Sequence, residues 1–448
     1  MKAFKAYDIR GVYNRDFNKD DVYKIGFFLA QLLNTKKILV GRDVRTSSPE
    51  IYEYLTKGIL DSGADVYDAG LATTPMIYWG TAQYGFDASV MITASHNPAE
   101  YNGLKVSKTN ALPVGYDSGL SELEELISNE NPKPVATKGK IFPNDFSAAY
   151  LAFQKSKLRD ISNLNIAVDV SNGMAGLFIR SILGDTAHYI FEELDGTFPN
   201  HEANPLVAEN IVDIQKLVME TKADVGVIFD GDADRVMFVD ENSRFISPDL
   251  IIALLANHFL KEKTKGVRVL QDIRTSKAVG EYISKFNGEM HMWRVGRAYA
   301  ALKLREIDGL FGGELAGHYY FKEFYYSDSG LLAASLVLNI LSDFKKQGIR
   351  FSEAIKQIEV YENSGEINFK LERKQEAMDA VIAHFKQIGV PDAFYDFDGY
   401  RIEFPDWWLN IRQSNTEPYL RFLAEAKTTV LLEKIVREST EIINKFKE

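Results

Sequence analysis

The sequence predicts an α/β protein made of several units: three tandem, related α/β units, each a mixed sheet with helices on both faces, and a last unit of α+β type. Over most of the chain, short apolar strands alternate with amphipathic helices, a pattern typical of mostly parallel sheets covered by helices. The length of 448 residues exceeds the roughly 100–200 residues of one domain. After residue 360 the alternation gives way to aromatic strands and two long helices. These observations favour four units over one.

The first two units are expected at residues 1–137 and 138–246, with a polar linker near 131–138. Each pairs compact apolar strands with periodic apolar helices. In chain order we predict a helix at 22–33, a strand at 38–40, a helix after Ser48, a strand that ends near Ser95, and strands at 166–170 and 223–229.

The last two units are expected at residues 247–360 and 361–448, joined near 361–366. The third unit begins with an apolar helix and a strand, whereas the fourth contains more antiparallel-type strands, which indicates the α+β class. The predicted elements are a helix at 247–263, strands at 267–270 and 367–371, a helix at 373–388, strands at 407–411 and 420–424, and a helix from Thr429.

An internal repeat favours related units. The segments ILVGRDVRTSS, from Ile38, and RVLQDIRTSKA, from Arg268, share a buried strand, an Asp, an Arg and a Thr-Ser step into a helix. Ser or Thr at that step can cap the free amides of the helix. The repeat is explained either by an ordinary strand-to-helix loop or by tandem units of common origin.

Composition excludes several classes of function. Lys and Arg number 52 and Asp and Glu 63, so the formal charge is 52 − 63 = −11, which disfavours nucleic-acid binding. The absence of Cys excludes disulfides and thiolate metal sites and favours a reducing, cytoplasmic location. The opening MKAFKAYDIRG does not read as a secretion signal. The apolar stretch 250–260 is too short for a membrane, which needs about 20 residues.

The first chemical motif is TASHNP, followed by YNGLK. It places Ser95 after an apolar strand, where α/β sheets bind ligands, so Ser95 is a candidate nucleophile. A free hydroxyl is a weak nucleophile and needs a base, a metal or a cation, which His96 and Lys105 could supply. A simple capped turn explains the same residues.

The second motif is DGDADR, in which Asp230, Asp232 and Asp234 alternate after a buried strand. Three such carboxylates repel one another unless a cation lies between them. Hard oxygen ligands next to a phosphate suit Mg²⁺, and the later Glu of a calcium-binding EF-hand is missing. Arg235 adds a planar phosphate donor. The alternative is a solvated acidic turn.

The third motif is GGELAGH, with Glu314 and His318 between glycine turns. A carboxylate there can accept hydrogen bonds from two sugar hydroxyls, although a hairpin turn with a satisfied His is equally consistent with the pattern.

The fourth motif is RQSNTEP, between two apolar strands of the last unit. Its guanidinium, hydroxyls and clustered amides can form an anion-binding concavity, and it lacks the Gly-Lys of a nucleotide P-loop. An ordinary turn is the alternative. The residues concerned are Arg412, Ser414, Asn415 and Thr416.

In this order the four motifs resemble the α-D-phosphohexomutase family, in its bacterial phosphomannomutase/phosphoglucomutase branch. The opening YDIRG, with Arg10, and the segment 321–330 agree with this. The resemblance covers nearly the whole chain. It implies four domains around a central cleft, three of them homologous, with one motif from each domain.

The resemblance also implies roles for the site residues. Ser95 would carry the transferable phosphoryl group and, with Asp230, Asp232 and Asp234, hold Mg²⁺. Two positions depart from the family pattern: Ala316 stands where many relatives have Ser, and Arg297 where many have His. The remaining implied roles are phosphate contact by Arg10, Lys105 and Arg235, proton transfer by His96 and Lys105, sugar binding by Glu314, Ala316 and His318, and binding of the distal phosphate by Arg412, Ser414, Asn415, Thr416, Arg421 and Arg297.

The expected reaction is reversible phosphoryl transfer between the 1- and 6-positions of a hexose phosphate, through a bound hexose 1,6-bisphosphate that also serves as activator. Mannose and glucose phosphates are favoured over glucosamine phosphate. The expected partner is this small substrate, with the protein a monomer or weak homodimer. Two alternatives are a Mg²⁺-dependent phosphatase with a phosphoserine intermediate and a non-catalytic sugar-phosphate sensor.

Overall fold

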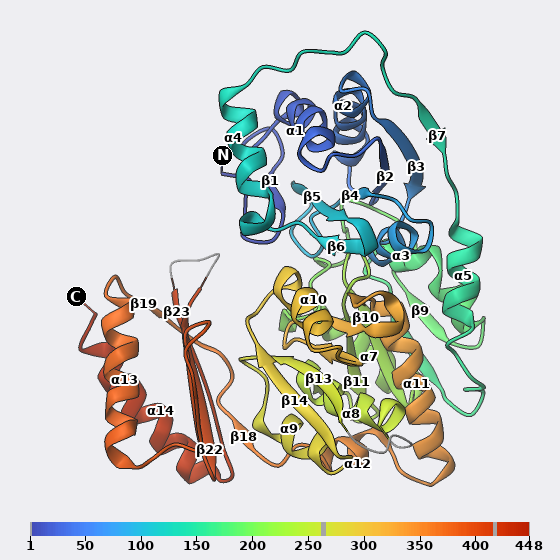
Figure 1. The fold of residues 1–448 in the computed structure, drawn as a ribbon. Helices are drawn as coiled ribbons and strands as arrows, with labels where there is room; N and C mark the ends of the chain where they lie inside the picture. The colour runs from blue at the N-terminus through green and yellow to red at the C-terminus, as the bar shows by residue number, and fades with distance from the viewer. Residues whose placement is uncertain (1, 261–265, 415–418, 448) are drawn as a thin grey trace.

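The computed structural model describes residues 2–260, 266–414 and 419–447. Four sheets follow one another along the chain, three of them mixed and the last antiparallel (Figure 1). This confirms the predicted fold class. None of the helices in the described ranges combines the length and the apolar character that crossing a membrane requires.

The first sheet has the strand order β1-β5-β4-β2-β3-β7, with β6 paired to β5. Strand β2 is parallel to β3 and β4, whereas β5 is antiparallel to β4. Strand β7, which follows the polar segment expected as a linker, adds to this sheet beside β3. The elements are β1 (Ile9–Val12), α1 (Lys19–Leu32), β2 (Lys37–Arg42), α2 (Ser48–Asp61), β3 (Asp65–Leu71), α3 (Thr74–Gln83), β4 (Ala88–Ile92), β5 (Tyr101–Lys108), β6 (Leu112–Pro113), α4 (Leu120–Asn129) and β7 (Ile141–Pro143).

Helix α1 begins three residues before the predicted start at residue 22, because local hydrogen bonds cap it there. The Asn18 side chain accepts from the amides of Asp20 and Asp21, and Asp21 accepts from the amide of Asn18. This reciprocal capping box satisfies amides that a helix start leaves free.

The second sheet has the order β12-β11-β10-β8-β9. Strand β10 is parallel to β8 and antiparallel to β11, and all of its residues are buried. The elements are α5 (Ser147–Lys155), β8 (Ile166–Asp169), α6 (Ile179–Leu183), β9 (His188–Ile190), α7 (Val212–Thr221), β10 (Val225–Phe229), β11 (Val236–Asp240) and β12 (Phe245–Ile246).

The third sheet has the order β14-β13-β15-β16-β17. The helix predicted at 247–263 is α8, which ends at Phe259, and residues 261–263 lie outside the described ranges. The elements are α8 (Pro248–Phe259), β13 (Val267–Asp272), α9 (Lys277–Ser284), β14 (Gly288–Trp293), α10 (Arg297–Glu306), β15 (Phe311–Gly313), β16 (Tyr319–Phe321), β17 (Ser327–Asp328), α11 (Gly330–Lys346) and α12 (Phe351–Lys356).

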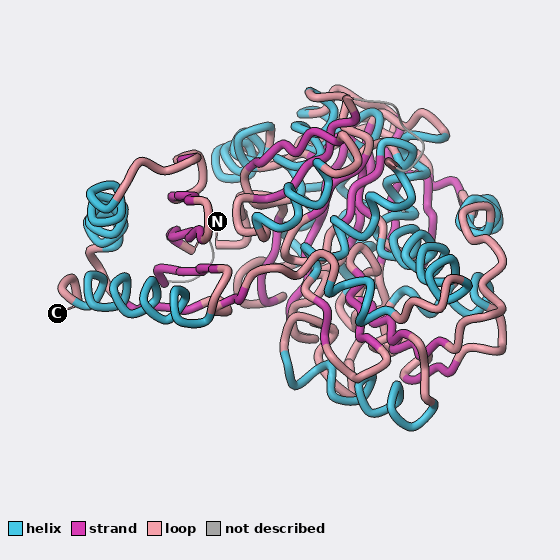
Figure 2. The backbone as a smooth tube through the Cα atoms, turned by 90° about the horizontal axis from the view of Figure 1, so that it is seen from below, coloured by secondary structure: helices cyan, strands magenta, loops and turns pink. Residues whose placement is uncertain are grey.

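The fourth sheet is antiparallel in the order β18-β23-β22-β21-β20, with β19 paired to β23. Helices α13 and α14 cover one of its faces, and the unit stands to one side of the rest of the molecule (Figures 1 and 2). The elements are β18 (Glu362–Asn363), β19 (Ile367–Lys370), α13 (Lys374–Ile388), β20 (Ala393–Tyr395), β21 (Tyr400–Phe404), β22 (Trp407–Gln413), β23 (Tyr419–Ala426) and α14 (Thr429–Asn444).

The three α/β units repeat one local structure where a central strand ends. After β2, β8 and β13, an Asp side chain accepts a hydrogen bond from the amide two residues later: Asp43 from Arg45 at 3.0 Å, Asp169 from Ser171 at 2.8 Å, and Asp272 from Arg274 at 2.7 Å. Such turns mimic a backbone turn and fix the direction of the loop. The shared turn favours the tandem-unit interpretation of the sequence repeat.

The expected Ser caps are found in only one of the two repeated segments. Ser276 accepts from the amide of Ala278 at the start of α9, as expected. Ser47 makes no side-chain cap at α2, and the neighbouring Ser48 hydroxyl donates to Asp43 at 2.6 Å. The Ser47 hydroxyl instead accepts from the Asn102 side chain at 2.9 Å.

One continuous apolar core joins the three α/β units. Trp79 of the first unit, Phe229 of the second and Leu332 of the third belong to the same buried cluster, whereas the fourth unit has its own cluster around Trp407 and Phe422. Close packing resists relative movement of the elements it joins. The loops of the first three units are therefore held in a fixed relation to one another.

The fourth unit is attached to the third through buried polar contacts. The Arg401 guanidinium donates to the carbonyls of Ile273 at 2.9 Å and Thr275 at 2.5 Å. The Glu425 carboxylate accepts from the Ser276 hydroxyl at 2.6 Å and from the Trp408 indole at 2.7 Å. Burial raises the pKa of Glu425 to about 7, Asp249 adds to the effect, and the hydrogen bonds oppose it.

We predict that Glu425 makes stability depend on pH. Because its folded-state pKa lies above the ordinary value of about 4.3, the folded protein keeps a proton that the unfolded chain has lost, and stability falls as the pH rises from about 4.3 to 7. Glu425→Gln should remove this loss, which amounts to about 3–4 kcal/mol at pH 8.

Thermal unfolding midpoints measured from pH 5 to pH 8 test this prediction. The advantage of Glu425→Gln should widen with pH, while the exposed control Glu362→Gln follows the wild type. A constant difference between Glu425→Gln and the wild type across the range would contradict it.

Candidate active site

The Ser95 loop follows β4, the central strand of the first sheet, and faces the second unit. Ser95 is 3% exposed and has a positive φ of 53°. Its hydroxyl donates to Asp230 Oδ2 at 2.8 Å. A left-handed backbone at a residue with a side chain costs of order 1–3 kcal/mol and persists where the surroundings impose it, often at functional sites. The structure therefore brings the predicted nucleophile to the first of the three predicted acids.

The three acids lie in the turn between β10 and β11. Asp230, Asp232 and Asp234 are fully buried, and their carboxylate oxygens lie within 4.8 Å of one another. Burial raises the pKa of Asp230 to about 7, and Asp234 raises it further while Arg235 lowers it. Among the described residues, Oδ1 of Asp232 and Oδ1 of Asp234 have no hydrogen-bond partner. Buried oxygens of this kind are the ligands that Mg²⁺ prefers, so the donor set fits the expected ion.

Two cations enclose this carboxylate cluster. Lys105, on β5 beside β4, donates from Nζ to Asp232 at 2.6 Å and to Asp234 at 2.5 Å. Arg235 donates from Nε to Asp230 at 2.9 Å. Burial lowers the pKa of Lys105, but Asp232 and Asp234 outweigh burial and raise it above its ordinary value. Lys105 is therefore a permanent cation at neutral pH.

Arg10 lies on β1, next to β5, and borders the Ser95 loop. Its guanidinium donates to Asn97 at 2.8 Å and to Asp8 at 2.5 Å. The pKa of Arg10 is raised although burial opposes it, since Asp8, Asp232 and Asp234 favour the charged form. This places a third cation at the edge where a phosphate on Ser95 would lie.

His96 differs in charge from its neighbours. Its Nδ1 lies 3.4 Å from Ser95 Oγ. Burial first, and then Arg235, Arg10 and Lys105, hold the pKa of His96 well below its usual range. The ring is therefore neutral and can accept a proton, whereas Lys105 cannot. The two expected proton-transfer residues thus differ in what they can do.

The Glu314 loop connects β15 and β16 in the third unit. Glu314 is buried, its Oε1 accepts from the Tyr320 hydroxyl at 2.8 Å, and burial raises its pKa. The turn is held by Asp272, which accepts from the Leu315 amide at 2.8 Å. Ala316, in the same turn, contributes no side-chain hydrogen-bonding atom.

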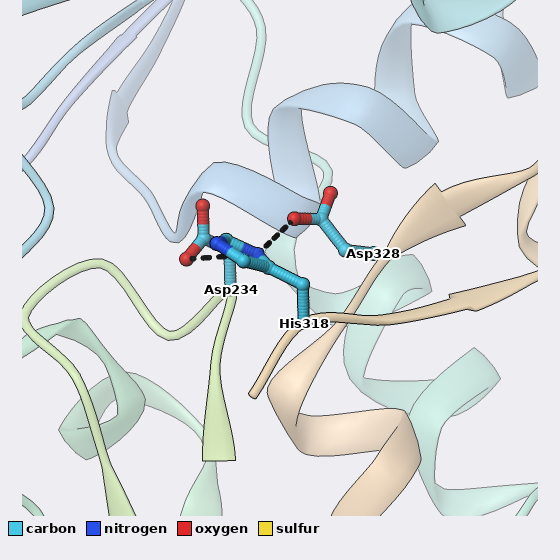
Figure 3. Close-up of side chains that lie close together, drawn as sticks. All are labelled: Asp234, His318 and Asp328. Atoms are coloured by element: carbon cyan, nitrogen blue, oxygen red, sulfur yellow. Dashed lines mark hydrogen bonds and ion pairs between the residues drawn. The ribbon is translucent and has the colours of Figure 1, made fainter. Parts of the chain in front are cut away.

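His318, at the end of this loop, contacts the Asp230–Asp234 loop of the second unit. A β-bridge joins it to Arg235, and its Nδ1 lies 2.7 Å from Asp328 Oδ2 and 3.8 Å from Asp234 Oδ1 (Figure 3). Burial lowers the pKa of His318, but Asp234 and Asp328 outweigh it and raise the pKa. These three residues could also hold a metal. In this structure the imidazole hydrogen-bonds to Asp328, and Asp234 Oδ1 makes no hydrogen bond among the described residues.

Arg297, at the start of α10, contacts the other side of the Asp328 carboxylate. Its Nε donates to Asp328 Oδ1 at 3.2 Å, and its guanidinium lies 3.6 Å from the ring centre of Tyr78, on α3 of the first unit. The Asp328 carboxylate thus lies between a permanent cation and His318. The departure from His to Arg at this position keeps one positive charge at every pH.

The fourth loop brings two arginines together. Arg412 on β22 and Arg421 on β23 are direct cross-strand partners. Arg412 donates to Asp398 at 3.4 Å, and Asp398 also accepts from the Val295 amide of the third unit at 2.9 Å. Burial lowers the pKa of Arg412 and so does the nearby Arg274. Arg412 is buried, whereas Arg421 is half-buried and pairs with Glu366 at 3.1 Å. Two neighbouring guanidinium groups favour an anion.

The rest of the fourth motif is described only in part. The amide of Ser414 donates to the Tyr419 carbonyl at 2.9 Å, which closes the loop. Asn415 and Thr416 lie outside the described residues.

Several residues of this region were not assigned to the site from the sequence. Asp272 and Arg274 pair at 2.7 Å beside the Glu314 loop, and Asp328 orients His318. The signal for the first pair was present, because Asp and Arg recur in both repeated segments. Thr74, whose hydroxyl donates to Asp232, carried no signal in the sequence.

Family models support the same division of the chain. Models described as phosphoglucomutase/phosphomannomutase α/β/α domains I, II and III match residues 1–133, 145–243 and 247–361. A model of the C-terminal domain of that family matches residues 366–442.

Relatives align over nearly the full length. A phosphomannomutase of Methanocaldococcus jannaschii is 36% identical over 100% of this chain and 98% of its own. A phosphomannomutase of Escherichia coli K12 is 34% identical over 99% of both chains. The crystal structure of a phosphoglucomutase/phosphomannomutase family protein from Burkholderia thailandensis superposes with a TM-score of 0.89 at 28% identity, over 99% of this chain and 97% of that one.

We predict that Asp328 sets the charge and orientation of His318. In Asp328→Asn the imidazole loses its hydrogen-bonded carboxylate and keeps only the more distant charges of Asp234 and Glu314, so the pKa of His318 should fall. Turnover should fall about 10- to 100-fold, as expected for a displaced contact group.

NMR titration of the His318 ring, together with steady-state kinetics, tests this prediction. The matched control is Asp308→Asn, which removes a carboxylate that pairs with Lys322 on the surface. An unchanged His318 titration in Asp328→Asn would show that the contact does not set the charge.

Proposed function

The chain belongs to the phosphoglucomutase/phosphomannomutase family and is a phosphohexomutase, and we propose that it transfers a phosphoryl group reversibly between the 1- and 6-positions of a hexose phosphate. The substrate we propose is mannose phosphate, with glucose phosphate as a second substrate. The names of the relatives support mannose. One observation carries the mechanism: the Ser95 hydroxyl lies 2.8 Å from a carboxylate of a buried Asp cluster, which supports a phosphoserine at a metal site.

We propose four domains, at residues 1–137, 138–246, 247–360 and 361–448, each with one site loop. The ranges of the matching family models support these boundaries within a few residues at most junctions. The exception is the segment around β7, which pairs with the first sheet although it follows the first boundary.

Mg²⁺ is the proposed cofactor, held by Asp230, Asp232, Asp234 and an oxygen of Ser95 or its phosphoryl group. When bound, the ion would neutralise charge on the transferring phosphoryl group. The chain itself supplies Arg10, Lys105 and Arg235 around the same position. Their cations offset the negative charge of both the acids and the phosphoryl group.

In the proposed first step, a sugar hydroxyl attacks the phosphorus of phospho-Ser95. The new bond forms between the hydroxyl oxygen and phosphorus, and the bond from phosphorus to Ser95 Oγ breaks. Neutral His96, whose Nδ1 lies 3.4 Å from Ser95 Oγ, accepts the hydroxyl proton and passes it to the Ser95 oxygen, which leaves as a hydroxyl. Lys105 stays charged beside the phosphoryl group. The product is a bound hexose 1,6-bisphosphate.

In the second step, the bisphosphate is bound in the opposite orientation and returns its other phosphoryl group to Ser95. The released monophosphate is then the isomer of the one that entered. Free hexose 1,6-bisphosphate can phosphorylate Ser95 in the same way and so serves as the initial phosphoryl donor. Positioning and charge neutralisation account for most catalysis of this type.

The sugar and its distal phosphate bind to the third and fourth units in this proposal. Glu314 and His318 hold the sugar hydroxyls, and the Ala316 turn adds only backbone groups. The proposed phosphate ligands are Arg412, Ser414, Asn415, Thr416, Arg421 and Arg297. The cross-strand pair of arginines, with the pKa of Arg412 lowered by burial and by Arg274, supports an anion there.

We predict that Ser95→Ala loses mutase activity by at least about 10³-fold, as removal of a nucleophile does. The test is a coupled assay with mannose 1-phosphate and glucose 1-phosphate side by side, with intact-mass analysis after incubation with glucose 1,6-bisphosphate. The wild type and the control Ser62→Ala should gain one phosphoryl group, whereas Ser95→Ala should not.

Two outcomes would contradict the proposed function. Full mutase turnover by Ser95→Ala would exclude the phosphoserine. Release of inorganic phosphate in place of an isomer by the wild type would indicate the phosphatase alternative.

We predict that Mg²⁺ binds to the three-Asp cluster and stabilises the protein. A ligand at 100 times its Kd adds about 2.7 kcal/mol to the stability of the folded state. Isothermal titration of EDTA-treated protein should show one site in the wild type and in the surface control Asp213→Asn, and none in Asp234→Asn. Equal Mg²⁺ binding by all three proteins would place the ion elsewhere.

A further inference from the structure

Arg45 donates hydrogen bonds to several backbone carbonyls of the Ser95 loop. Its Nη1 donates to the carbonyls of Pro98 at 2.6 Å and Tyr101 at 3.0 Å. Its Nη2 donates to the carbonyls of Ser95 at 2.9 Å and Asn97 at 2.6 Å. One side chain thus binds four carbonyl oxygens within a single seven-residue segment.

The same contacts exclude Arg45 as a phosphate ligand. A guanidinium has five N–H donors, and the four at the two terminal nitrogens point to loop carbonyls. The fifth, at Nε, lies 3.2 Å from Asp43 Oδ2. Nε forms no hydrogen bond among the described residues, but it faces the Asp43 carboxylate, and the side chain is 1% exposed, so it has no open face for substrate.

The second unit encloses this arrangement from the other side. The ring centre of Phe198 lies 5.0 Å from the guanidinium. A Cβ at Gly196 would lie 2.5 Å from the Cα of Arg45, and a Cβ at Gly231 would lie 2.5 Å from the Ser95 carbonyl oxygen. At both positions only glycine allows the two backbones to lie this close, so the Ser95 carbonyl lies between Arg45 and the Asp230–Asp234 loop.

Both backbone polar groups of Ser95 are therefore fixed. Its amide donates to the Thr93 hydroxyl at 2.9 Å, and its carbonyl accepts from Arg45. Ser95 has the positive φ that directs its hydroxyl to Asp230, and such a conformation persists only where several contacts impose it.

We infer that Arg45 is a positioning residue that holds Ser95 in the conformation needed to receive and donate the phosphoryl group. This inference rests on the proposed phosphoryl transfer at Ser95. In the step concerned, Ser95 Oγ bonds to a phosphorus of the bisphosphate, the sugar oxygen–phosphorus bond breaks, and the serine proton is released while the sugar oxygen gains one. Arg45 acts on this step only through the loop.

The test uses Arg45→Lys, which keeps the charge but cannot span four carbonyls. Unphosphorylated full-length protein is mixed with glucose 1,6-bisphosphate, and the mass of the phosphorylated form is followed with time. We expect phosphorylation at least tenfold slower than in the wild type, a similar fall in kcat, and a KM for the sugar phosphate within threefold. Because unfolded protein would also lower the apparent kcat at constant KM, both rates are expressed per folded protein, as measured by circular dichroism.

Two further variants complete the experiment. Arg42→Lys, in the same strand end but paired with Asp68, is the matched control and should react like the wild type. Arg45→Ala should regain part of its phosphorylation rate when guanidinium ion is added at millimolar concentration. If Arg45→Lys does not fold, Phe198→Leu, which uncovers the guanidinium, should slow phosphorylation at least threefold with KM unchanged.

The outcomes separate this inference from the proposed function. A wild type that gains no phosphoryl group would refute the phosphoserine and the inference with it. A normally phosphorylated wild type, beside a folded Arg45→Lys that reacts within twofold of its rate, would overturn the role of Arg45 and leave the proposed function intact.

Discussion

The contact between the Ser95 hydroxyl and the buried Asp230 carboxylate is the interaction on which the rest of the site depends. Ser95 ends a strand of the first sheet and Asp230 ends a strand of the second, so the contact exists only because the two sheets share one core. A buried carboxylate is costly unless it is paired. Arg235 and Lys105 supply that pairing, and the cations that stabilise the acids therefore also surround the hydroxyl.

The charges around the site have opposite effects on the pKa values of Lys105 and His96. Lys105 contacts two carboxylates and remains a cation, whereas His96 faces Arg235, Arg10 and Lys105 and remains neutral. His318 lies on the carboxylate side of the cluster, between Asp328 and Asp234, and its charged form is favoured. Burial alone would make all three neutral, so the placement of partners and not burial decides each case.

The sequence predicted the α/β class, four units and the main strands, because apolar periodicity and strand-end motifs are local properties. Helix α1 shows the limit of that approach, since its start is set by a reciprocal Asn18–Asp21 cap and not by the apolar period. Individual site motifs were also visible, because chemically demanding residues such as the three alternating acids stand out in a strand-end loop.

What the sequence could not show is which residues meet across units. Arg45 and Arg274 occupy the same place in a repeated segment, yet Arg45 points to the carbonyls of the Ser95 loop, whereas Arg274 lies beside Glu314 and Arg412. The difference arises from neighbours such as Phe198, which belong to another unit. Asp328 was missed for a different reason: it lies in the same unit as His318, but their contact depends on the pairing of β16 with β17.

At both ends of the site, a buried arginine donates to the carbonyls of a loop. Arg401 of the fourth unit donates to the carbonyls of Ile273 and Thr275, just as Arg45 donates to those of the Ser95 loop. A buried guanidinium satisfies several loop carbonyls at once without adding a side chain to the substrate space. A loop at a ligand site lacks the backbone hydrogen bonds of a helix or a sheet. Its buried carbonyls therefore need a donor from a side chain. Because Arg401 also ties the fourth sheet to the segment that follows Asp272, the position of Arg412 depends on the same kind of contact as the position of Ser95.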